Sequence, residues 1–553
     1  MNGVARWLVD RAQARALGRR AGAWAKRDRL VTAASIGTLA LFALTPWPAL
    51  AFIPLAAYAA LAWLRLDIAL CMLPLTFPYW YVPKSVVGHL VFPLSEIALG
   101  VCAAVALGRL AARWITGRWG GSPDLMPDVT AGAKPAPGMV TWARRAGMSL
   151  GWPLAAGAGV FVLGATLSLL AAVRPHEALR AYRWEIVEPL LYLALLLGVV
   201  RGRGSVRWMV WALLASAGVV ALLAIVQVTV WPVVFTPLAQ GNRLAPLARD
   251  VGGVYRATGI IFGSGNSLGA WMERALPLGL ALIMAPRSMA HGMDGLSRRA
   301  RLAAGGLCLA CLLALIWSGS RGAWVGALAG VALVACLAAV GRPWLVAAVA
   351  AVGGAVALWL RGPLAAAALG GHGGTGELRT LVWLAAWHML RDHPLLGIGL
   401  DQFVYLYSNL YTAHPYWITS LNGRPTEVWR EPTLAHPHNL ALDLWLSVGV
   451  LGLMGFVVVV WALGRRCWRL WRAGQRAGHR SGANESGANE SGANWAAVVA
   501  LGVMGSMLAG LVHGMVDSAY FLPDLALVFW WSVGLVLLAG RLGEEMGGRS
   551  SGS

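Results

Sequence analysis

Charged side chains are scarce in this sequence. Asp, Glu, Lys and Arg together make up 12% of its 553 residues, whereas a soluble protein has about 25%. Hydrophobic residues make up 58%, and the mean hydropathy is +0.63. A soluble globular domain is therefore excluded, and the composition predicts a chain that lies mainly in lipid.

Cysteines are also few, and none of them indicates a disulfide framework. The six cysteines lie in apolar stretches or at a basic edge. Cys308 and Cys311 form a C-x-x-C pattern in an apolar run without His or Asp nearby, which favours packing over metal or redox chemistry. We expect no cleavable signal peptide, because the first apolar run begins only near Leu30 and lacks a small-residue cleavage site.

Acidic residues are outnumbered, with 24 Asp and Glu against 45 Lys and Arg, which gives a net charge of +21. In a soluble protein this charge would suggest nucleic-acid binding, so the location of the cations decides between nucleic acid and membrane lipid as the partner. They gather between apolar stretches, at residues 1–30, 109–145, 287–301 and 465–480. The positive-inside rule assigns these blocks to the cytoplasm, and we expect them to contact membrane lipids and not nucleic acid.

Apolar stretches long enough to cross a bilayer recur along the whole chain. Fourteen candidate spans can be drawn, at residues 31–45, 48–64, 66–82, 90–108, 150–173, 186–200, 207–231, 266–286, 302–318, 322–340, 343–360, 441–463, 495–516 and 523–541. Prolines interrupt some of them, near residues 45–48 and 74–83, which favours half helices or re-entrant segments there. The predicted fold is an all-α polytopic membrane protein with about twelve, and up to fourteen, transmembrane helices.

The polar segments divide the chain into predicted parts. These are a cytoplasmic basic segment 1–30, a transmembrane domain 31–360, an outer cap loop 361–440, C-terminal transmembrane helices 441–541 with a cytoplasmic linker 464–494, and a cytoplasmic tail 542–553. The linker contains a repeated Ser-Gly-Ala-Asn-Glu unit, which is typical of flexible polar chain. The cap is rich in aromatic residues and has helical spacing at 381–390, so we expect it to fold and pack on the membrane domain.

Several arginines fall on the outer side of this topology. Arg180 and Arg183 would share one face of a helix, although Glu185 and Glu188 on the same segment make an internal ion-pair network the alternative. Arg256 precedes a polar turn that ends at Asn266, where the start of a helix would favour an anion.

Arg321 lies in the small-residue sequence Ser318-Gly-Ser-Arg321-Gly, where a ligand or backbone can come close, and the alternative is an arginine that snorkels to the interface. Arginines from distant segments with few carboxylates to neutralise them indicate a polyanionic ligand. A diphosphate fits, because the guanidinium offers paired donors and keeps its charge near lipid.

Metal-binding patterns are lacking, and no cofactor is predicted. No two of the twelve Asp residues are two positions apart, so the chain has no Asp-x-Asp motif. His436 and His438 form an H-x-H pair, but no third ligand of matching spacing is visible. We favour His438 as a general base because it lies beside Asn439 at a helix start, with His436 as the competing candidate and a structural histidine as the further alternative.

Four blocks of the C-terminal half belong together. They are Arg256-Ala-Thr-Gly with Gly-Ser-Gly-Asn266, Ser318-Gly-Ser-Arg321-Gly, Gly376-Glu-Leu-Arg379 with Trp383 and His393-Pro-Leu-Leu-Gly397-Ile-Gly399, and His438-Asn439 with Gly449-Val-Leu-Gly452. In this order the blocks resemble the O-antigen ligase and Wzy-like polymerase superfamily of membrane glycosyltransferases. The resemblance is closest in overall layout to the O-antigen ligase family.

The resemblance implies a GT-C-like fold of about twelve transmembrane helices with a large periplasmic loop, in the bacterial inner membrane. It implies a donor glycan on undecaprenyl diphosphate and, for a ligase, the lipid A-core oligosaccharide as acceptor. A Wzy-type polymerase would extend the glycan instead, and a protein O-oligosaccharyltransferase would pass it to Ser or Thr. These alternatives stay open at this point.

The resemblance also suggests roles for individual residues in a metal-independent, inverting transfer. His438 would accept or orient the proton of the acceptor hydroxyl, with His436, Asn439 and Asn266 in support. The donor diphosphate would be bound by Arg183, Arg256 and Arg321, assisted by Arg180 and Arg379.

Two functions of other classes compete with transfer. A transporter of lipid-linked sugar or of a small anion would also use outward arginines and Pro-broken helices. The inner halves of the spans are poor in ionisable residues, which weighs against such a path. A structural scaffold would leave the outer Arg and His residues unexplained.

Overall fold

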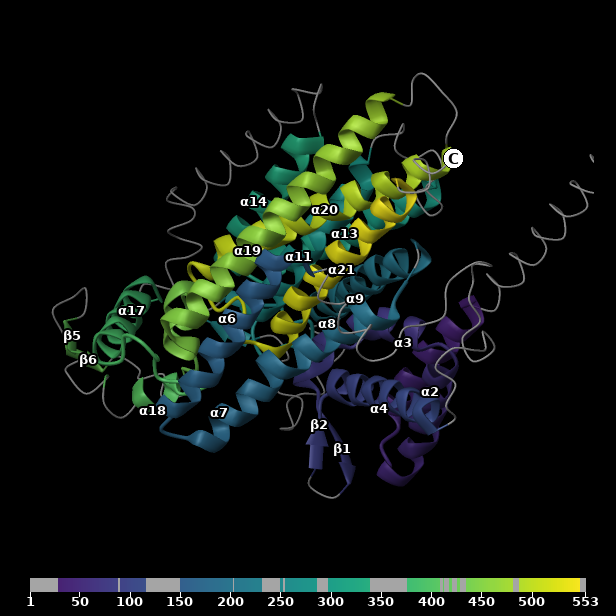
Figure 1. The fold of residues 1–553 in the computed structure, drawn as a ribbon. Helices are drawn as coiled ribbons and strands as arrows, with labels where there is room; N and C mark the ends of the chain where they lie inside the picture. Colours follow the sequence, from purple (N-terminus) through teal and green to yellow (C-terminus); the bar gives the residue numbers. More distant parts are fainter. Residues whose placement is uncertain are drawn as a thin grey trace, which may run out of the picture.

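Helices make up nearly all of the part of the chain that the structure describes (Figure 1). The computed structural model describes residues 28–87, 90–115, 150–201, 203–230, 249–251, 254–285, 297–338, 375–407, 411, 417–419, 425–427, 434–480 and 487–547. A first helix covers residues 28–44. The longer helices that follow are α2 (Pro48–Leu64), α4 (Leu94–Ile115), α6 (Trp152–Ser168), α9 (Arg203–Thr229), α11 (Gly265–Met284), α13 (Arg298–Trp317), α14 (Arg321–Ala338), α17 (Thr375–Asp392), α19 (Leu440–Arg480), α20 (Gly487–Gly514) and α21 (Pro523–Gly547).

Shorter elements connect these helices. The short α-helices are α3 (Leu66–Met72), α7 (Pro175–Tyr182), α8 (Glu188–Val199) and α18 (Phe403–Leu406), and a π-helical segment, Arg183–Val187, joins α7 to α8. The strands of the described residues form three antiparallel pairs, β1 (Lys84–Val87) with β2 (Leu90–Phe92), β3 (Arg249–Val251) with β4 (Val254–Arg256), and β5 (Trp417–Thr419) with β6 (Pro425–Glu427).

The helices identify a multi-pass membrane protein. Among the described residues, eight segments are long and apolar enough to span a bilayer: Leu94–Ala112, Trp152–Ala171, Gly204–Thr229, Arg298–Trp317, Arg321–Ala338, Leu440–Arg476, Asn494–Gly514 and Pro523–Arg541. A ninth arises if α2 and the following segment Leu66–Leu75, which bend by 119° at their junction, count as one broken span. Short 3-10 helices at Leu73–Leu75 and Phe77–Tyr81 continue this segment, where prolines predicted an interruption.

The described residues account for eight or nine of the twelve to fourteen predicted spans, and the others remain a prediction. Residues 28–44, α8 and α11 are helical at three predicted spans, yet none is among the eight. Helix α11 carries adjacent charges at Glu273 and Arg274, which lower its hydropathy. The predicted span 343–360 lies outside the described residues.

Helices α6 and α19 are in close backbone contact. A Cβ atom added at Gly164 would lie 2.2 Å from the backbone nitrogen of Gly452, and one at Gly455 would lie 2.3 Å from that of Phe161. Small residues allow such close approach, which increases dispersion contact between helices in lipid. Helix α21, yellow in Figure 1, lies against this bundle with Trp530 and Trp531 fully buried.

The cap folds against the start of α19, at one end of the bundle (Figure 1). Helix α17 covers the segment with predicted helical spacing at 381–390, and its buried Val382 and Met389 share a cluster with Phe403 and Leu446. The indole of Trp445 donates a hydrogen bond to the carbonyl of Pro394 (2.7 Å). This packing is what a folded cap on the membrane domain requires, and the bounds of the cap and its periplasmic location remain predictions.

Two glycines let the cap loop interlock with a kink in α19. Gly397 and Gly449 both have a φ of 68°, in the left-handed region that other residues rarely adopt. A Cβ atom at Gly397 would lie 2.2 Å from the carbonyl oxygen of Leu446, and one at Gly449 would lie 2.6 Å from that of Leu395. Two sequence blocks that are about fifty residues apart therefore fit together, and the short first part of α19 turns toward the cap.

The predicted linker 464–494 needs correction. Helix α19 continues to Arg480, and α20 already begins at Gly487. The cations of Arg465 and Arg472 lie over the rings of Trp461 and Trp468, at helical spacing, which stabilises the helix beyond the apolar stretch.

Candidate functional site

Three helices begin next to one another at the cap end of the bundle. Helices α11 and α14 start at Gly265 and Arg321, and a Cβ atom at Gly265 would lie only 2.3 Å from the carbonyl oxygen of Ser318. The third helix, α19, starts just after His438 and Asn439. Helix N-termini carry partial positive charge and unpaired N–H groups, so their meeting favours an anion.

Arg256 joins the first two helix starts. Its Nε donates to the carbonyl of Ser318 (2.8 Å), and its Nη2 donates to Oδ1 of Asn266 (2.5 Å). Gly319, with a φ of 62°, leaves room for this side chain, because a Cβ atom there would lie 3.0 Å from Nε of Arg256. The structure thus brings together two sequence blocks predicted to share a site.

Three of the predicted arginines share one electrostatic neighbourhood. Burial, opposed by the charge of Asp517, lowers the pKa of Arg256, and the charges of Arg321 and Arg379 lower it further. Within the described part of the chain, none of these three arginines forms an ion pair with a carboxylate. The cluster therefore has a surplus of positive charge that an anionic ligand would neutralise.

His438 is held in a strained position at the start of α19. Its φ is 51°, in the left-handed region, and its carbonyl accepts a hydrogen bond from the indole of Trp383 in the cap (3.3 Å). Asn439 caps the helix, since its Oδ1 accepts from the backbone nitrogens of Ala441 (3.1 Å) and Leu442 (3.2 Å). Such strain is kept where the surroundings fix it, and is common at functional sites.

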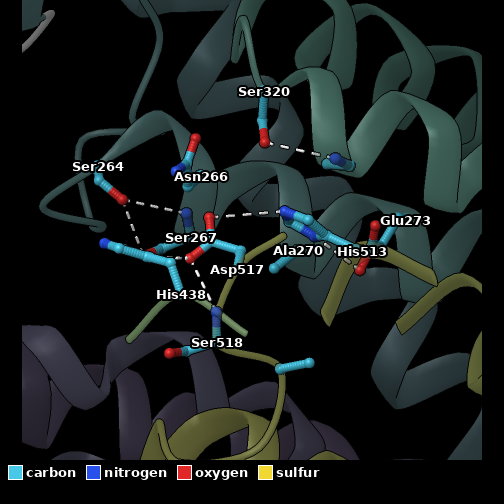
Figure 2. A network of polar contacts seen from close by, with 12 residues as sticks. Ser264, Asn266, Ser267, Ala270, Glu273, Ser320, His438, His513, Asp517 and Ser518 are labelled. Carbon is cyan, nitrogen blue, oxygen red and sulfur yellow. Dashed lines mark hydrogen bonds and ion pairs between the residues drawn. The ribbon is translucent and has the colours of Figure 1, made fainter. Parts of the chain in front are cut away.

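Asp517 orients the imidazole of His438. The Nδ1 atom of His438 lies 2.7 Å from Oδ1 of Asp517, and the side chain of His438 is 30% exposed. With Nδ1 protonated against the carboxylate, Nε2 is free to accept a proton. Asp517 lies in the turn between α20 and α21, close to the starts of α11 and α19 (Figure 2).

Burial alone would raise the pKa of Asp517, but its contacts with His438 and His513 hold that pKa below the usual range. Its Oδ1 also accepts a hydrogen bond from the backbone nitrogen of Ser518 (2.8 Å). Asp517 is therefore an anion that can stabilise a charged imidazole.

A series of polar side chains continues from Asp517 into the helix bundle. Figure 2 shows His438, Asp517, His513 and Glu273 in one line. Nε2 of His513 lies 3.7 Å from Oδ2 of Asp517, and its Nδ1 lies 3.1 Å from Oε1 of Glu273. Sequence reasoning missed these partners, although the His513-x-x-x-Asp517 spacing at the end of a span and the charged pair at 273–274 were available signals.

His436 occupies a different environment from His438. Its Nδ1 lies 3.3 Å from both carboxylate oxygens of Asp443, and Oδ2 also accepts from the hydroxyl of Ser518 (3.1 Å). Burial alone would lower the pKa of His436, but the carboxylates of Asp443, Glu185 and Asp401 raise it to about 9. At neutral pH this imidazole is charged, so it has no free nitrogen with which to accept a proton.

Arg180 and Arg183 are placed in ion pairs. Arg183 Nη1 lies 2.8 Å from Glu96, and its Nε lies 3.6 Å from Glu188. Arg180 pairs with Glu177 (2.5 Å) and Asp401 (3.3 Å). Both guanidiniums remain 43–45% exposed. Both arginines therefore belong to an internal ion-pair network, the alternative that the sequence left open. Of the two expected partners, Glu188 lies near Arg183, while the other partners are Glu96, Glu177 and Asp401.

Across the described residues, no group of three or more His, Cys, Asp and Glu side chains is arranged to hold a metal ion. The side chains present can accept a proton at His438 and hold an anion at the three arginines.

Comparison with known families places part of this site in a recognised domain. Residues 306–457 match a family model described as O-Antigen ligase. This range contains Arg321, Arg379 and His438, and it leaves Arg256 and Asp517 outside. A search of curated proteins finds no match.

Proposed function

Residues 306–457 form an O-antigen ligase family domain, and from this premise we propose that the chain is an O-antigen ligase. In this proposal it transfers a polysaccharide from undecaprenyl diphosphate to the lipid A-core oligosaccharide, on the periplasmic face of the bacterial inner membrane. The domain itself implies a glycan ligase or polymerase type of membrane enzyme that acts on lipid-linked glycan. The observation that carries the proposal is the His438–Asp517 pair beside three arginines without carboxylate partners in the described structure.

The transfer we propose needs one base and one anion site. The acceptor hydroxyl oxygen attacks the anomeric carbon from the face opposite the diphosphate, and its proton passes to Nε2 of His438. The bond from that carbon to the diphosphate oxygen breaks, and both bonding electrons leave with undecaprenyl diphosphate. The diphosphate is a good leaving group, so positioning and charge stabilisation supply most of the rate enhancement.

We assign the base role to His438 and not to His436. The pKa of His436 is raised to about 9 by carboxylates, so His436 is protonated near neutral pH. In His438, Nδ1 contacts the carboxylate of Asp517 and the side chain is partly exposed. An imidazole oriented in this way by a buried carboxylate is suited to proton acceptance.

We assign the diphosphate to Arg256, Arg321 and Arg379. Among the described residues no carboxylate forms an ion pair with them, and Asn266 fixes the guanidinium of Arg256. Arg180 and Arg183 receive a supporting role at the edge of the site, because their charges are already paired while their guanidiniums stay partly exposed. Paired donors to phosphate are the strength of arginine in such sites.

Reactions of related kinds use the same donor. A Wzy-type polymerase would place a growing lipid-linked glycan where we place lipid A-core, and a protein O-oligosaccharyltransferase would place a Ser or Thr there. The alternative of another class is a transporter of lipid-linked sugar, which gives no role to a base oriented by Asp517.

The test is a reconstituted transfer reaction. Purified protein in vesicles receives undecaprenyl-diphosphate glycan and lipid A-core, without nucleotide or added metal, and products are separated by size. We expect glycan-bearing lipid A that forms only when both substrates are present. Longer lipid-linked glycan with unchanged lipid A would indicate a polymerase, and movement of intact donor across the bilayer without transfer would indicate a transporter.

A further inference from the structure

Two adjacent charged residues lie buried in α11. Glu273 has no exposed surface and Arg274 is 6% exposed, in a helix surrounded by α13, α14 and α20. Charged groups inside a membrane bundle are costly unless they are paired, and they usually serve a function. The transfer proposed above makes no use of either residue.

Both residues are directed at the turn that carries Asp517. Arg274 Nη2 donates to the carbonyl of Ala519 (2.8 Å), two residues after Asp517. Glu273 Oε1 lies 3.1 Å from Nδ1 of His513, whose Nε2 faces Oδ2 of Asp517 at 3.7 Å. The pair in α11 therefore reaches this turn at two points, once through the backbone and once through an imidazole. Figure 2 shows the second route, from Glu273 through His513 to Asp517.

Two glycines of helix α14 leave room for this arrangement. A Cβ atom at Gly322 would lie 2.6 Å from Cδ2 of His513, and one at Gly326 would lie 2.6 Å from Oε2 of Glu273. The ring of His513 is thus enclosed between α14 and two carboxylates, and it cannot rotate freely.

The two oxygens of Asp517 have different partners. Oδ1 is bound to the imidazole of His438 and to the backbone nitrogen of Ser518. Oδ2 is buried and has no hydrogen bond within the described structure, and Nε2 of His513 is the donor that faces it. On the Oδ2 side, His513 is therefore the side chain among the described residues that is placed to keep the carboxylate from turning about its Cβ–Cγ bond.

We propose that His513 and Glu273 are positioning residues that fix the orientation of Asp517 and, through it, that of the His438 imidazole; this inference rests on the proposed function. Glu273 holds Nδ1 of His513, so that Nε2 stays directed at Asp517. Asp517 then keeps its Oδ1 on Nδ1 of His438, and Nε2 of His438 points to the acceptor. Partners that orient metal-binding histidines typically change activity about 10- to 100-fold when they are removed, and we expect a loss of that size here.

Two substitutions of one residue separate positioning from packing. The amide nitrogen of Gln can take the place of Nε2, and that of Asn can take the place of Nδ1. We expect His513→Gln to keep kcat within about threefold of the wild type, and His513→Asn to lower kcat about 10- to 100-fold. The KM values for the lipid-linked donor and for lipid A-core should stay unchanged in both.

Ser506→Ala is the matched control. Its hydroxyl donates to the backbone carbonyl of Arg274, also from α20 to α11, but outside the chain that leads to His438. It should lower the thermal stability and leave kcat per folded molecule unchanged. If His513→Asn does not accumulate, Glu273→Gln gives the same readout, with a several-fold loss of kcat and unchanged KM values.

The outcomes are distinguishable. An inactive wild type would overturn the proposed function together with this inference. An active wild type in which His513→Asn, or Glu273→Gln in its place, retains full kcat would overturn the positioning role alone. A loss of kcat of the same size in His513→Gln and Ser506→Ala would also overturn it, because it would show general disruption of the α11–α20 contact.

Discussion

At the scale of single residues, the arginines fall into two groups, those whose charge is neutralised by an ion pair and those whose charge is not. Arg321 and Arg379 each repel the charge of Arg256, and none of the three has an ion pair in the described structure, whereas Arg180 and Arg183 are paired. An unneutralised cluster is stable in a protein only where solvent or a ligand compensates it. The donor diphosphate is the ligand that we propose for it.

Arg321→Gln should weaken donor use selectively. The loss of a charge-assisted hydrogen bond to phosphate costs about 1.5–3 kcal/mol, so the KM for the donor should rise roughly 10- to 100-fold while that for the acceptor changes little. Titration of each substrate separately measures both values. Arg183→Gln is the comparison, because it leaves Glu96 and Glu188 without their cation and should reduce stability more than donor affinity. Equal effects on donor and acceptor in Arg321→Gln would contradict the assignment.

His436 predicts a pH dependence of stability. Its pKa in the folded protein is raised from an ordinary 6.5 to about 9, so its ion pairs stabilise the fold fully below pH 6.5. That contribution is lost as the pH rises through about 9. Thermal unfolding between pH 6 and 10 should therefore show a steeper decline in the wild type than in His436→Gln. Parallel declines would show that His436 does not titrate in this way.

Sequence reasoning found the arginines and His438, because such residues are conspicuous in an apolar chain. It identified the His438–Asn439 helix start, and the structure shows Asn439 capping that helix. It could not identify Asp517, because nothing local links a carboxylate to a histidine 79 positions away. The pairing depends on how α20 packs beside α19, which is a property of tertiary structure.

At the scale of helices, the apolar stretches predicted most elements well. Helices α6, α9, α13 and α14 lie within a few residues of predicted spans. The junction of α2 and α3 lies where the predicted spans 48–64 and 66–82 meet, but its 119° bend and the kink at Gly449 could not be predicted, since both depend on packing in three dimensions. Helix α19 also runs beyond its apolar part, where Arg–Trp contacts extend it in place of the expected linker.

Two glycines of α6 give a matched test of helix packing. A Cβ atom at Gly164 would meet the backbone of Gly452, whereas one at Gly159 would meet nothing within 4 Å. Gly164→Ala should destabilise the protein by about 1–3 kcal/mol through overpacking. Gly159→Ala should be neutral or stabilise it by up to about 1 kcal/mol, because alanine is the better helix former. Thermal unfolding in detergent measures both, and equal stability of the two variants would contradict the described α6–α19 contact.

At the scale of the whole molecule, the site is assembled from segments far apart in the chain. Arg256 ends the second strand of a hairpin, Arg321 and His438 lie at helix starts, Arg379 lies in the cap, and Asp517 lies between the last two helices. The sequence predicted the membrane class and the cap from composition and periodicity. It could not predict how the cap, the helix starts and the final turn meet, since that depends on long-range packing.

The most direct test of this account compares two histidines in one transfer reaction. His438→Ala and His436→Ala are purified, reconstituted at equal folded amounts, and assayed for transfer of glycan to lipid A-core in a single turnover. Loss of a general base typically costs 10²- to 10⁴-fold. If His438 is the base, His438→Ala should fall to about 1% of the wild-type rate or below, while His436→Ala should stay within roughly tenfold of it. An active His438→Ala together with an inactive His436→Ala would contradict it.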